Sequence, residues 1–335
     1  MKCCIQNKLP WICTLSLDNM FKFKTPSNKT RKIMSKVASG EIEENFEEKC
    51  VDEIKNLTRH EYAKITSSGN NSIFIALSAI KGDIIVPDQG GWHGFKQIAK
   101  FLNKEIITIK TDLGIIDPEE LDNFDLKENS ALIFTSFAAY TAEQDIKAIS
   151  KYCKSNGITT IEDASAGIGD KQNKLGNGNQ SDIIIASTGS PKIINVGSGG
   201  FITTNNKEIF DETSLPQKLS KTNQIVCSGI YSELENVSDK LEVTLNATMH
   251  LKNSIPNAIH SKKRGVNVIF LDENAKENNW KLKKSLPIDK SGFITKCPNY
   301  NRIKQKGLAL EIKNLDYSCL EKEYLDKIIE EVNNL

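Results

Sequence analysis

Apolar and polar positions follow two different periods along the first two thirds of the chain. Residues 41–57 carry apolar side chains at helical spacing, whereas residues 62–66 and 83–86 are short apolar runs typical of buried strands. Short strands that alternate with helices favour a mainly parallel sheet with helices on both faces, hence an α/β fold. On the same grounds we predict helices over 72–80, 95–102 and 145–155 and from Asp117, and strands over 105–109, 131–134, 158–161, 183–186 and 201–204.

The alternation weakens beyond about residue 211. Helices over 232–241, 248–255 and 320–332, with strands over 266–271 and 308–312, predict a smaller α+β domain. We therefore divide the chain into a poorly defined leader (1–33), a large domain (34–210) and a small C-terminal domain (211–335).

Composition excludes several classes of function. The 335 residues carry 44 basic and 43 acidic side chains, which gives no argument for a nucleic-acid partner. No run of about 18 apolar residues predicts a membrane span, and the apolar stretch at 9–17 is short and interrupted by Pro10, which favours a leader over a signal peptide. The eight cysteines form no CxxC pair and have no histidine at ligand spacing, so we expect a reducing cytoplasm and no metal site.

Four polar clusters follow predicted strands, at the edge where open α/β sheets bind ligands. In the first, Ser68, Gly69 and Asn70 precede a helix, and small residues there let backbone N–H groups converge on an anion. An ordinary strand-to-helix turn would have the same sequence. In the second, Trp92 and His93 follow a glycine-rich turn, where an aromatic ring can stack on a planar ligand or cover the sheet edge.

The other two clusters supply a carboxylate and an amine. Asp163 ends an apolar strand, where burial of its charge calls for a cationic partner, unless it caps a helix. Lys192 follows Ser187 by five residues among small side chains that let a ligand approach, although a surface lysine is the alternative. Together, an anion cradle, a stacking aromatic, a buried carboxylate and a lysine meet the requirements of pyridoxal 5′-phosphate (PLP).

The chain resembles the DegT/StrS-type aminotransferases, PLP enzymes of fold type I that typically aminate keto-sugars carried on nucleotides. The matching motifs are Ser67-Ser-Gly-Asn70, Gly82-Asp-Ile-Ile-Val-Pro87, Ile161-Glu-Asp-Ala164, the Ser187 to Lys192 spacing, Gly197-Ser-Gly-Gly200 and Asn246-Ala-Thr-Met249. The resemblance implies a large domain with a seven-stranded-type sheet, a small α+β domain, and a homodimer in which Asn246 reaches the cofactor phosphate of the other subunit.

The resemblance also implies the role of each candidate. Lys192 would hold PLP covalently and then act as general base, and Asp163 would keep the pyridine nitrogen protonated. Trp92 or His93 would stack on the ring. Ser68, Gly69, Asn70 and Ser187 would hold the phosphate.

Some positions depart from the family pattern. Asn70 replaces a threonine, Ala166 replaces a glutamine or histidine that contacts the ring hydroxyl, and Thr248 replaces an arginine. These positions lie around the substrate pocket or the cofactor edge, so PLP binding is expected to survive while the substrate is not fixed by them.

We therefore predict an aminotransferase that moves an amino group from a small-molecule donor to a keto-sugar or similar carbonyl acceptor. The alternatives are elimination or lyase chemistry on the same scaffold, sulfur transfer through Cys297, and a non-catalytic PLP-binding regulatory protein.

Overall fold

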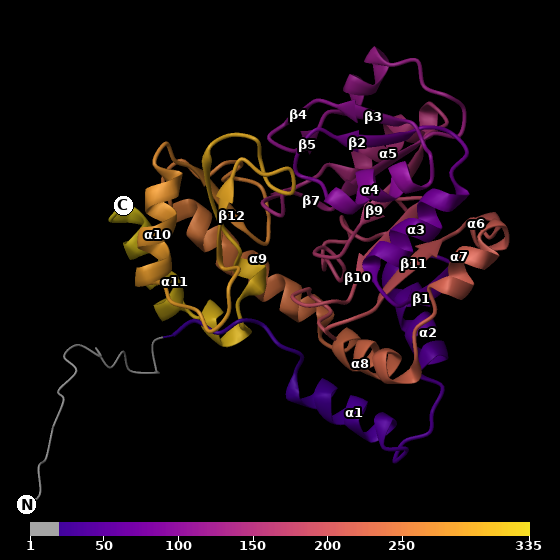
Figure 1. Cartoon of the computed structure of the whole chain (residues 1–335), viewed down its shortest axis with the longest axis horizontal. Helices are drawn as coiled ribbons and strands as arrows, with labels where there is room; N and C mark the ends of the chain where they lie inside the picture. Colours follow the sequence, from indigo (N-terminus) through magenta and orange to yellow (C-terminus); the bar gives the residue numbers. More distant parts are fainter. Residues whose placement is uncertain (1–19) are drawn as a thin grey trace, which may run out of the picture.

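A seven-stranded sheet organises the larger part of the molecule, whose computed structural model describes residues 20–335 (Figure 1). The strand order is β1-β11-β10-β9-β6-β2-β3. Strand β11 runs antiparallel to both its neighbours and the other six share one direction, so the predicted mainly parallel sheet is confirmed. The strands are Tyr62–Thr66 (β1), Ile84–Pro87 (β2), Ile106–Ile109 (β3), Ala131–Thr135 (β6), Thr159–Asp163 (β9), Ile183–Ser187 (β10) and Gly200–Thr204 (β11).

Helices cover both faces of this sheet because successive strand residues point to opposite sides. In β10, Ile183 and Ile185 belong to one apolar core, while Ile184 and Ala186 belong to another. The helices α3 (Gly69–Ala79) and α4 (His93–Phe101) contribute to the first core, and α2 (Phe46–Thr58) and α5 (Ile146–Ser155) contribute to the second. Two short helices, α6 (Glu208–Glu212) and α7 (Ser214–Leu219), follow β11 and lie close to α3.

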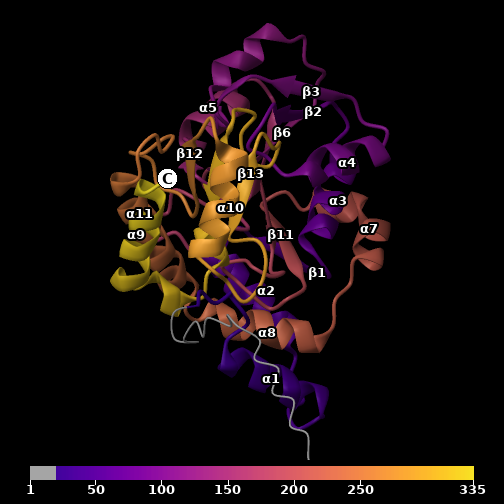
Figure 2. The same ribbon diagram turned by 60° about the vertical axis from the view of Figure 1, so that its left-hand side comes forward.

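A second, smaller unit lies beside the sheet at the yellow end of the chain in Figures 1 and 2. Its antiparallel sheet has the order β12-β14-β13, and its apolar core is separate from the two cores of the large sheet. Its elements are α9 (Val237–Ser254), β12 (Val268–Leu271), α10 (Ala275–Ser285), β13 (Ile294–Cys297), β14 (Gly307–Leu310), two 3-10 turns (η3, Ile312–Asn314, and η4, Tyr317–Leu320) and α11 (Lys322–Asn333). The pattern of residues predicted β12, β14 and α11 but neither α10 nor β13.

Several predicted helices differ in their ends. Helix α2 begins at Phe46 rather than at residue 41, because the side chain of Asn45 accepts a hydrogen bond from the backbone of Glu48 and starts the helix there. The helix expected from Asp117 is a 3-10 turn, η2 (Pro118–Asn123), with Asp117 as its N-cap. In place of the helices expected over 232–241 and 248–255, the chain forms α8 (Gln224–Leu234) and one continuous helix, α9. The polar residues between the two expected helices lie within α9 and do not interrupt it.

Part of the segment that the sequence left undefined is ordered against both units. Helix α1 (Asn28–Ala38), capped by Ser27, packs against α8, and Phe21 is fully buried in the core of the small unit. The apolar stretch at 9–17 and Cys3, Cys4 and Cys13 lie outside the described residues. Within residues 20–335, no helix is both long and apolar enough to cross a membrane.

Candidate active site

A cavity of about 250 Å³ opens at the carboxyl end of the parallel strands. Seven of the nine predicted site residues line it, and they come from four separate segments of the chain. The seven are Ser68, Gly69, Asn70, Trp92, Asp163, Ser187 and Lys192, joined by Ile73, Tyr140, Ser165, Ile185, Ala186 and Ser190.

One end of the cavity is built to receive an anion. Ser68 caps α3, and the first backbone N–H groups of that helix point out of its positive end. A Cβ on Gly69 would lie only 2.6 Å from the Cβ of Ser187, so only glycine lets the helix approach the end of β10 this closely. Ser187 accepts a hydrogen bond from the backbone of Gly189 (3.2 Å), which leaves its hydroxyl proton available to a ligand.

The side chain of Asn70 holds the aromatic wall of the cavity. The indole N–H of Trp92 donates to Asn70 Oδ1 over 3.0 Å. The amide nitrogen of Asn70 has no hydrogen-bond partner among residues 20–335, so it remains a donor. Asn70, which replaces the family's threonine, therefore holds Trp92 through its oxygen and keeps an N–H donor on its nitrogen.

Asp163 lies buried at the end of β9. One of its oxygens accepts hydrogen bonds from the backbone and hydroxyl of Ser165, whose hydroxyl oxygen in turn accepts from the backbone of Ser187 (2.8 Å). Burial raises the pKa of Asp163, against the opposing effects of Lys192 and Ser165. Its second oxygen has no partner in the described part of the chain, so a cationic ring nitrogen in the cavity would relieve the cost of burying this carboxylate.

The amine of Lys192 reaches the same cavity from the segment after β10. Its Nζ donates to the hydroxyl of Tyr140 over 3.3 Å. Burial by itself lowers the pKa of Lys192, but Tyr140 and Asp163 outweigh burial, and the pKa is raised. Lys192 Nζ is therefore held by a hydrogen bond to Tyr140 at the wall of the cavity.

Tyr140 is a site residue that the sequence analysis missed. It follows β6 by five residues and lies in the tight hairpin of β7 (Phe137–Ala138) and β8 (Ala142–Glu143). Ala139 and Tyr140 both have left-handed backbones (φ 52° and 63°), a conformation that costs non-glycine residues about 1–3 kcal/mol each and gathers at functional sites. Strands of two residues are too short to show an alternating pattern in the sequence. The one available signal for Tyr140 was an aromatic residue soon after the end of a strand.

His93 does not line the cavity. Its ring packs against Tyr300 at 4.9 Å between centroids, and its backbone N–H donates to Asn301. Of the two residues proposed to stack on the cofactor, the structure therefore places only Trp92 where a ring could bind.

Asn246 is also outside the cavity. It is exposed on α9 and lines a separate depression with Asp170, Gln172 and Arg264. Asn246 therefore does not touch the site of its own chain.

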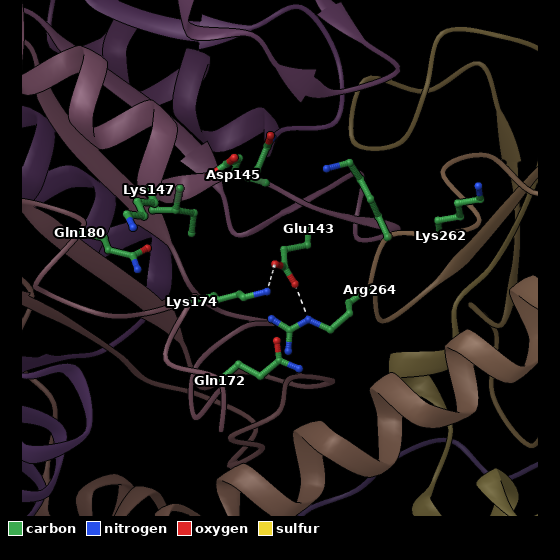
Figure 3. A pocket seen from close by; sticks show the side chains of 11 residues that line it. Glu143, Asp145, Lys147, Gln172, Lys174, Gln180, Lys262 and Arg264 are labelled. Carbon is green, nitrogen blue, oxygen red and sulfur yellow. Dashed lines mark hydrogen bonds and ion pairs between the residues drawn. The ribbon is translucent and has the colours of Figure 1, made fainter.

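A larger cavity, about 570 Å³, shares none of the residues that line the cavity of about 250 Å³ (Figure 3). Three of its charged side chains pair with one another: Glu143 lies between Lys174 and Arg264 in Figure 3. Outside the lining, Arg264 also pairs with Asp170 through two hydrogen bonds. Asp145 caps α5. Across residues 20–335, no group of three or more His, Cys, Asp or Glu side chains is arranged to hold a metal.

The residues of the smaller cavity fit PLP. They provide an anion cradle at one end, the indole of Trp92 as a wall, the free carboxylate oxygen of Asp163 and the amine of Lys192. Together with a mainly parallel seven-stranded sheet and a small α+β unit, this arrangement defines a PLP-dependent enzyme of fold type I.

The family follows from the sequence itself. Residues 27–227, more than half of the chain, match the model of the DegT/DnrJ/EryC1/StrS aminotransferase family, and the chain belongs to that family. The predicted family and its cofactor, PLP, are thereby confirmed, and the substrates of such an enzyme are small molecules. Residues 238–333 match a second model, the MJ1341 family C-terminal domain.

Solved structures support the fold at low sequence identity. Serine palmitoyltransferase of Sphingomonas wittichii is 13% identical and has a TM-score of 0.72, over 93% of this chain and 86% of that one. A sphingosine-1-phosphate lyase of Burkholderia pseudomallei is 10% identical, with a TM-score of 0.75 over 95% and 86%. NtdA of Bacillus subtilis, solved with bound cofactor PMP, is 16% identical, with a TM-score of 0.67 over 92% and 82%.

Proposed function

We propose that this protein is a PLP-dependent aminotransferase that transfers an amino group from a small donor to a keto-sugar or similar small carbonyl compound. The observation that carries the proposal is that Lys192 and Asp163 face one cavity whose far end is an anion cradle. When bound, PLP supplies an electron-withdrawing ring that stabilises negative charge at the carbon next to the amino group. Family membership favours amino transfer over the other reactions of this fold.

Each residue around the cavity has its own role in the proposed reaction. The N-terminus of α3 and Ser187 would hold the phosphate, Trp92 would stack on the ring, and an ionised Asp163 would face the ring nitrogen. Lys192 would hold the cofactor, and its amine would serve as the general base of the reaction.

The experiment that tests this function is a screen of amino donors against purified protein loaded with PLP. The expected result is conversion of bound pyridoxal phosphate to pyridoxamine phosphate by at least one donor, followed by absorbance and confirmed by mass. An elimination or lyase enzyme would release a product while the cofactor stays in the pyridoxal form. A regulatory protein would bind PLP and convert no donor.

One observation weighs against the sulfur-transfer alternative. Cys297 is buried in β13, and burial raises the pKa of its thiol, which disfavours the reactive thiolate. We retain a large and a small domain, and a cytoplasmic location, as parts of the proposal. Helices α6, α7 and α8 pack on helices of the large sheet, so we propose that the small domain begins at α9 rather than at residue 211.

Gly69→Ala is expected to weaken PLP binding at least tenfold, about 1.4 kcal/mol. The added methyl group would press on Ser187 and push the start of α3 away from the phosphate. Fluorescence titration with PLP measures the dissociation constant. Ser78→Ala, at the other end of α3, is the matched control and should bind as the wild type does. A PLP dissociation constant in Gly69→Ala equal to that of the wild type would mean that the start of α3 does not hold the phosphate.

The active unit is proposed to be a symmetric homodimer in which Asn246 serves the phosphate of the other subunit. Its exposed place on α9, outside its own cavity, supports this arrangement. Mixing inactive Lys192→Ala and Asn246→Ala subunits under exchange conditions should restore activity, because a mixed dimer then has one doubly altered site and one intact site.

The reverse arrangement makes the opposite prediction. If Asn246 acted within its own subunit, every site in the mixed dimer would keep one lesion and the mixture would stay inactive. A wild-type protein that sediments as a monomer at assay concentration would also refute the sharing.

A further inference from the structure

Tyr140 joins the reactive lysine to the small unit of the molecule. Its hydroxyl accepts the hydrogen bond from Lys192 Nζ over 3.3 Å. Its ring lies 4.9 Å from the guanidinium carbon of Arg302 and 4.9 Å from Nζ of Lys313, both measured to the ring centroid. Cations at this distance are attracted to an aromatic ring. Tyr140 therefore contacts both Lys192 and two residues of the small unit.

Arg302 and Lys313 are themselves fixed by the buried carboxylate of Glu311. Arg302 Nε and Nη2 each donate to a different oxygen of Glu311 over 2.7 Å, and Lys313 lies 3.0 Å from the same group. Burial opposes the charge on Glu311, but Lys313 and Arg302 outweigh it and lower its pKa to about 2. Glu311 therefore positions both cations against the Tyr140 ring.

The backbone of Tyr140 is held by the same unit. Its carbonyl accepts hydrogen bonds from the N–H groups of Val266 (2.9 Å) and Asn267 (3.0 Å). The side-chain amide of Asn267 donates to Glu311 over 2.6 Å. The ring and the left-handed backbone of Tyr140 are thus both fixed through one network centred on Glu311.

From these contacts we propose that Tyr140 is a catalytic residue that accepts a hydrogen bond from Lys192 Nζ, and that Arg302 is a positioning residue that holds Tyr140 in place. This inference rests on the proposed function, in which Lys192 Nζ is the reacting atom. Tyr140 fixes where the Nζ protons point and how readily the amine loses one. The charged groups that face Lys192 are Asp163, which favours the ammonium form, and Arg302 and Lys313, which oppose it.

The test reads Lys192 directly, in the full-length protein freed of cofactor. An amine-selective reagent is applied over a range of pH, and the labelling rate of the Lys192 peptide is followed by mass spectrometry. Tyr140→Phe removes the acceptor and should lower the apparent pKa of Lys192 by about one unit. Tyr300→Phe is the matched control: its hydroxyl donates to the backbone of Pro87, so the labelling curve should be that of the wild type.

Arg302→Gln separates positioning from a direct charge effect because the two predict opposite signs. Loss of a nearby positive charge alone would raise the pKa of Lys192. Loss of the group that holds Tyr140 should lower it, as Tyr140→Phe does. In the double variant the hydrogen bond is already lost, so Arg302→Gln should lower the pKa of Lys192 no further than Tyr140→Phe does alone.

An unchanged curve in Tyr140→Phe overturns the role of Tyr140, and a raised pKa in Arg302→Gln, or additive shifts in the double variant, overturns the role of Arg302. If circular dichroism finds Arg302→Gln unfolded, Arg302→Lys replaces it; this variant keeps the charge but not the planar two-bond geometry, and an unchanged pKa overturns the positioning. The labelling needs no bound PLP, so failure of the proposed function and failure of this inference give separate results.

Discussion

Lys192→Ala is expected to lose at least about a thousandfold in amino transfer while the fold stays intact. General acid–base catalysis by one side chain contributes roughly 10²–10⁴-fold, and here the same amine also holds the cofactor. Steady-state turnover with the donor identified by screening is the measurement. Lys218→Ala, which removes an exposed lysine of α7, is the control and should keep full activity.

The Lys192→Ala variant is also expected to keep part of its affinity for PLP. The anion cradle and Trp92 remain, so PLP should still bind, without a covalent bond and with a faster release. A Lys192→Ala protein that turns over at more than a tenth of the wild-type rate would mean that another base moves the proton.

Asp163→Asn is expected to reduce turnover at least about a hundredfold, or roughly 2.7 kcal/mol of activation free energy. A neutral amide cannot keep the ring nitrogen protonated, so the ring becomes a poor acceptor of electrons. The amide oxygen can still accept from Ser165, which should preserve the local structure and most of the PLP affinity. The pair of measurements is turnover and the PLP dissociation constant, and the expected pattern is a large loss in the first with little change in the second.

Asp145→Asn controls for the loss of a carboxylate elsewhere. Asp145 caps α5 outside the cavity, and asparagine caps helices equally well. Its turnover should stay at the wild-type value. Near-normal turnover in Asp163→Asn itself would show that another group faces the ring nitrogen.

The sheet could be predicted well from the sequence because its inner strands are buried on both faces. The run at 62–66 coincides with β1, and the strands that deliver Asp163 and Ser187 were found with ends one or two residues short. Parallel strands end at one edge, so finding the strands also placed Asp163, Ser187 and Lys192 together.

Features that depend on contacts between distant segments were not predictable. Helix α10 has charged residues on most of its surface and no clear period, and its boundaries depend on packing against β13. Tyr140 was missed because its place is set by Val266, Asn267 and Arg302, more than a hundred residues later. Trp92 and His93 are adjacent, so the sequence did not indicate which of them lines the cavity. The structure places His93 against Tyr300 and Trp92 in the cavity wall.

Covalent trapping identifies the residue that carries the cofactor, which we expect to be Lys192. The purified protein incubated with PLP should be yellow. Borohydride should reduce the bond between cofactor and lysine and fix the cofactor to a single peptide, which digestion and mass spectrometry identify. We expect the label on Lys192 alone, in amounts close to one per chain. A label on any other lysine, or no trapped cofactor under conditions where PLP is bound, would contradict this expectation.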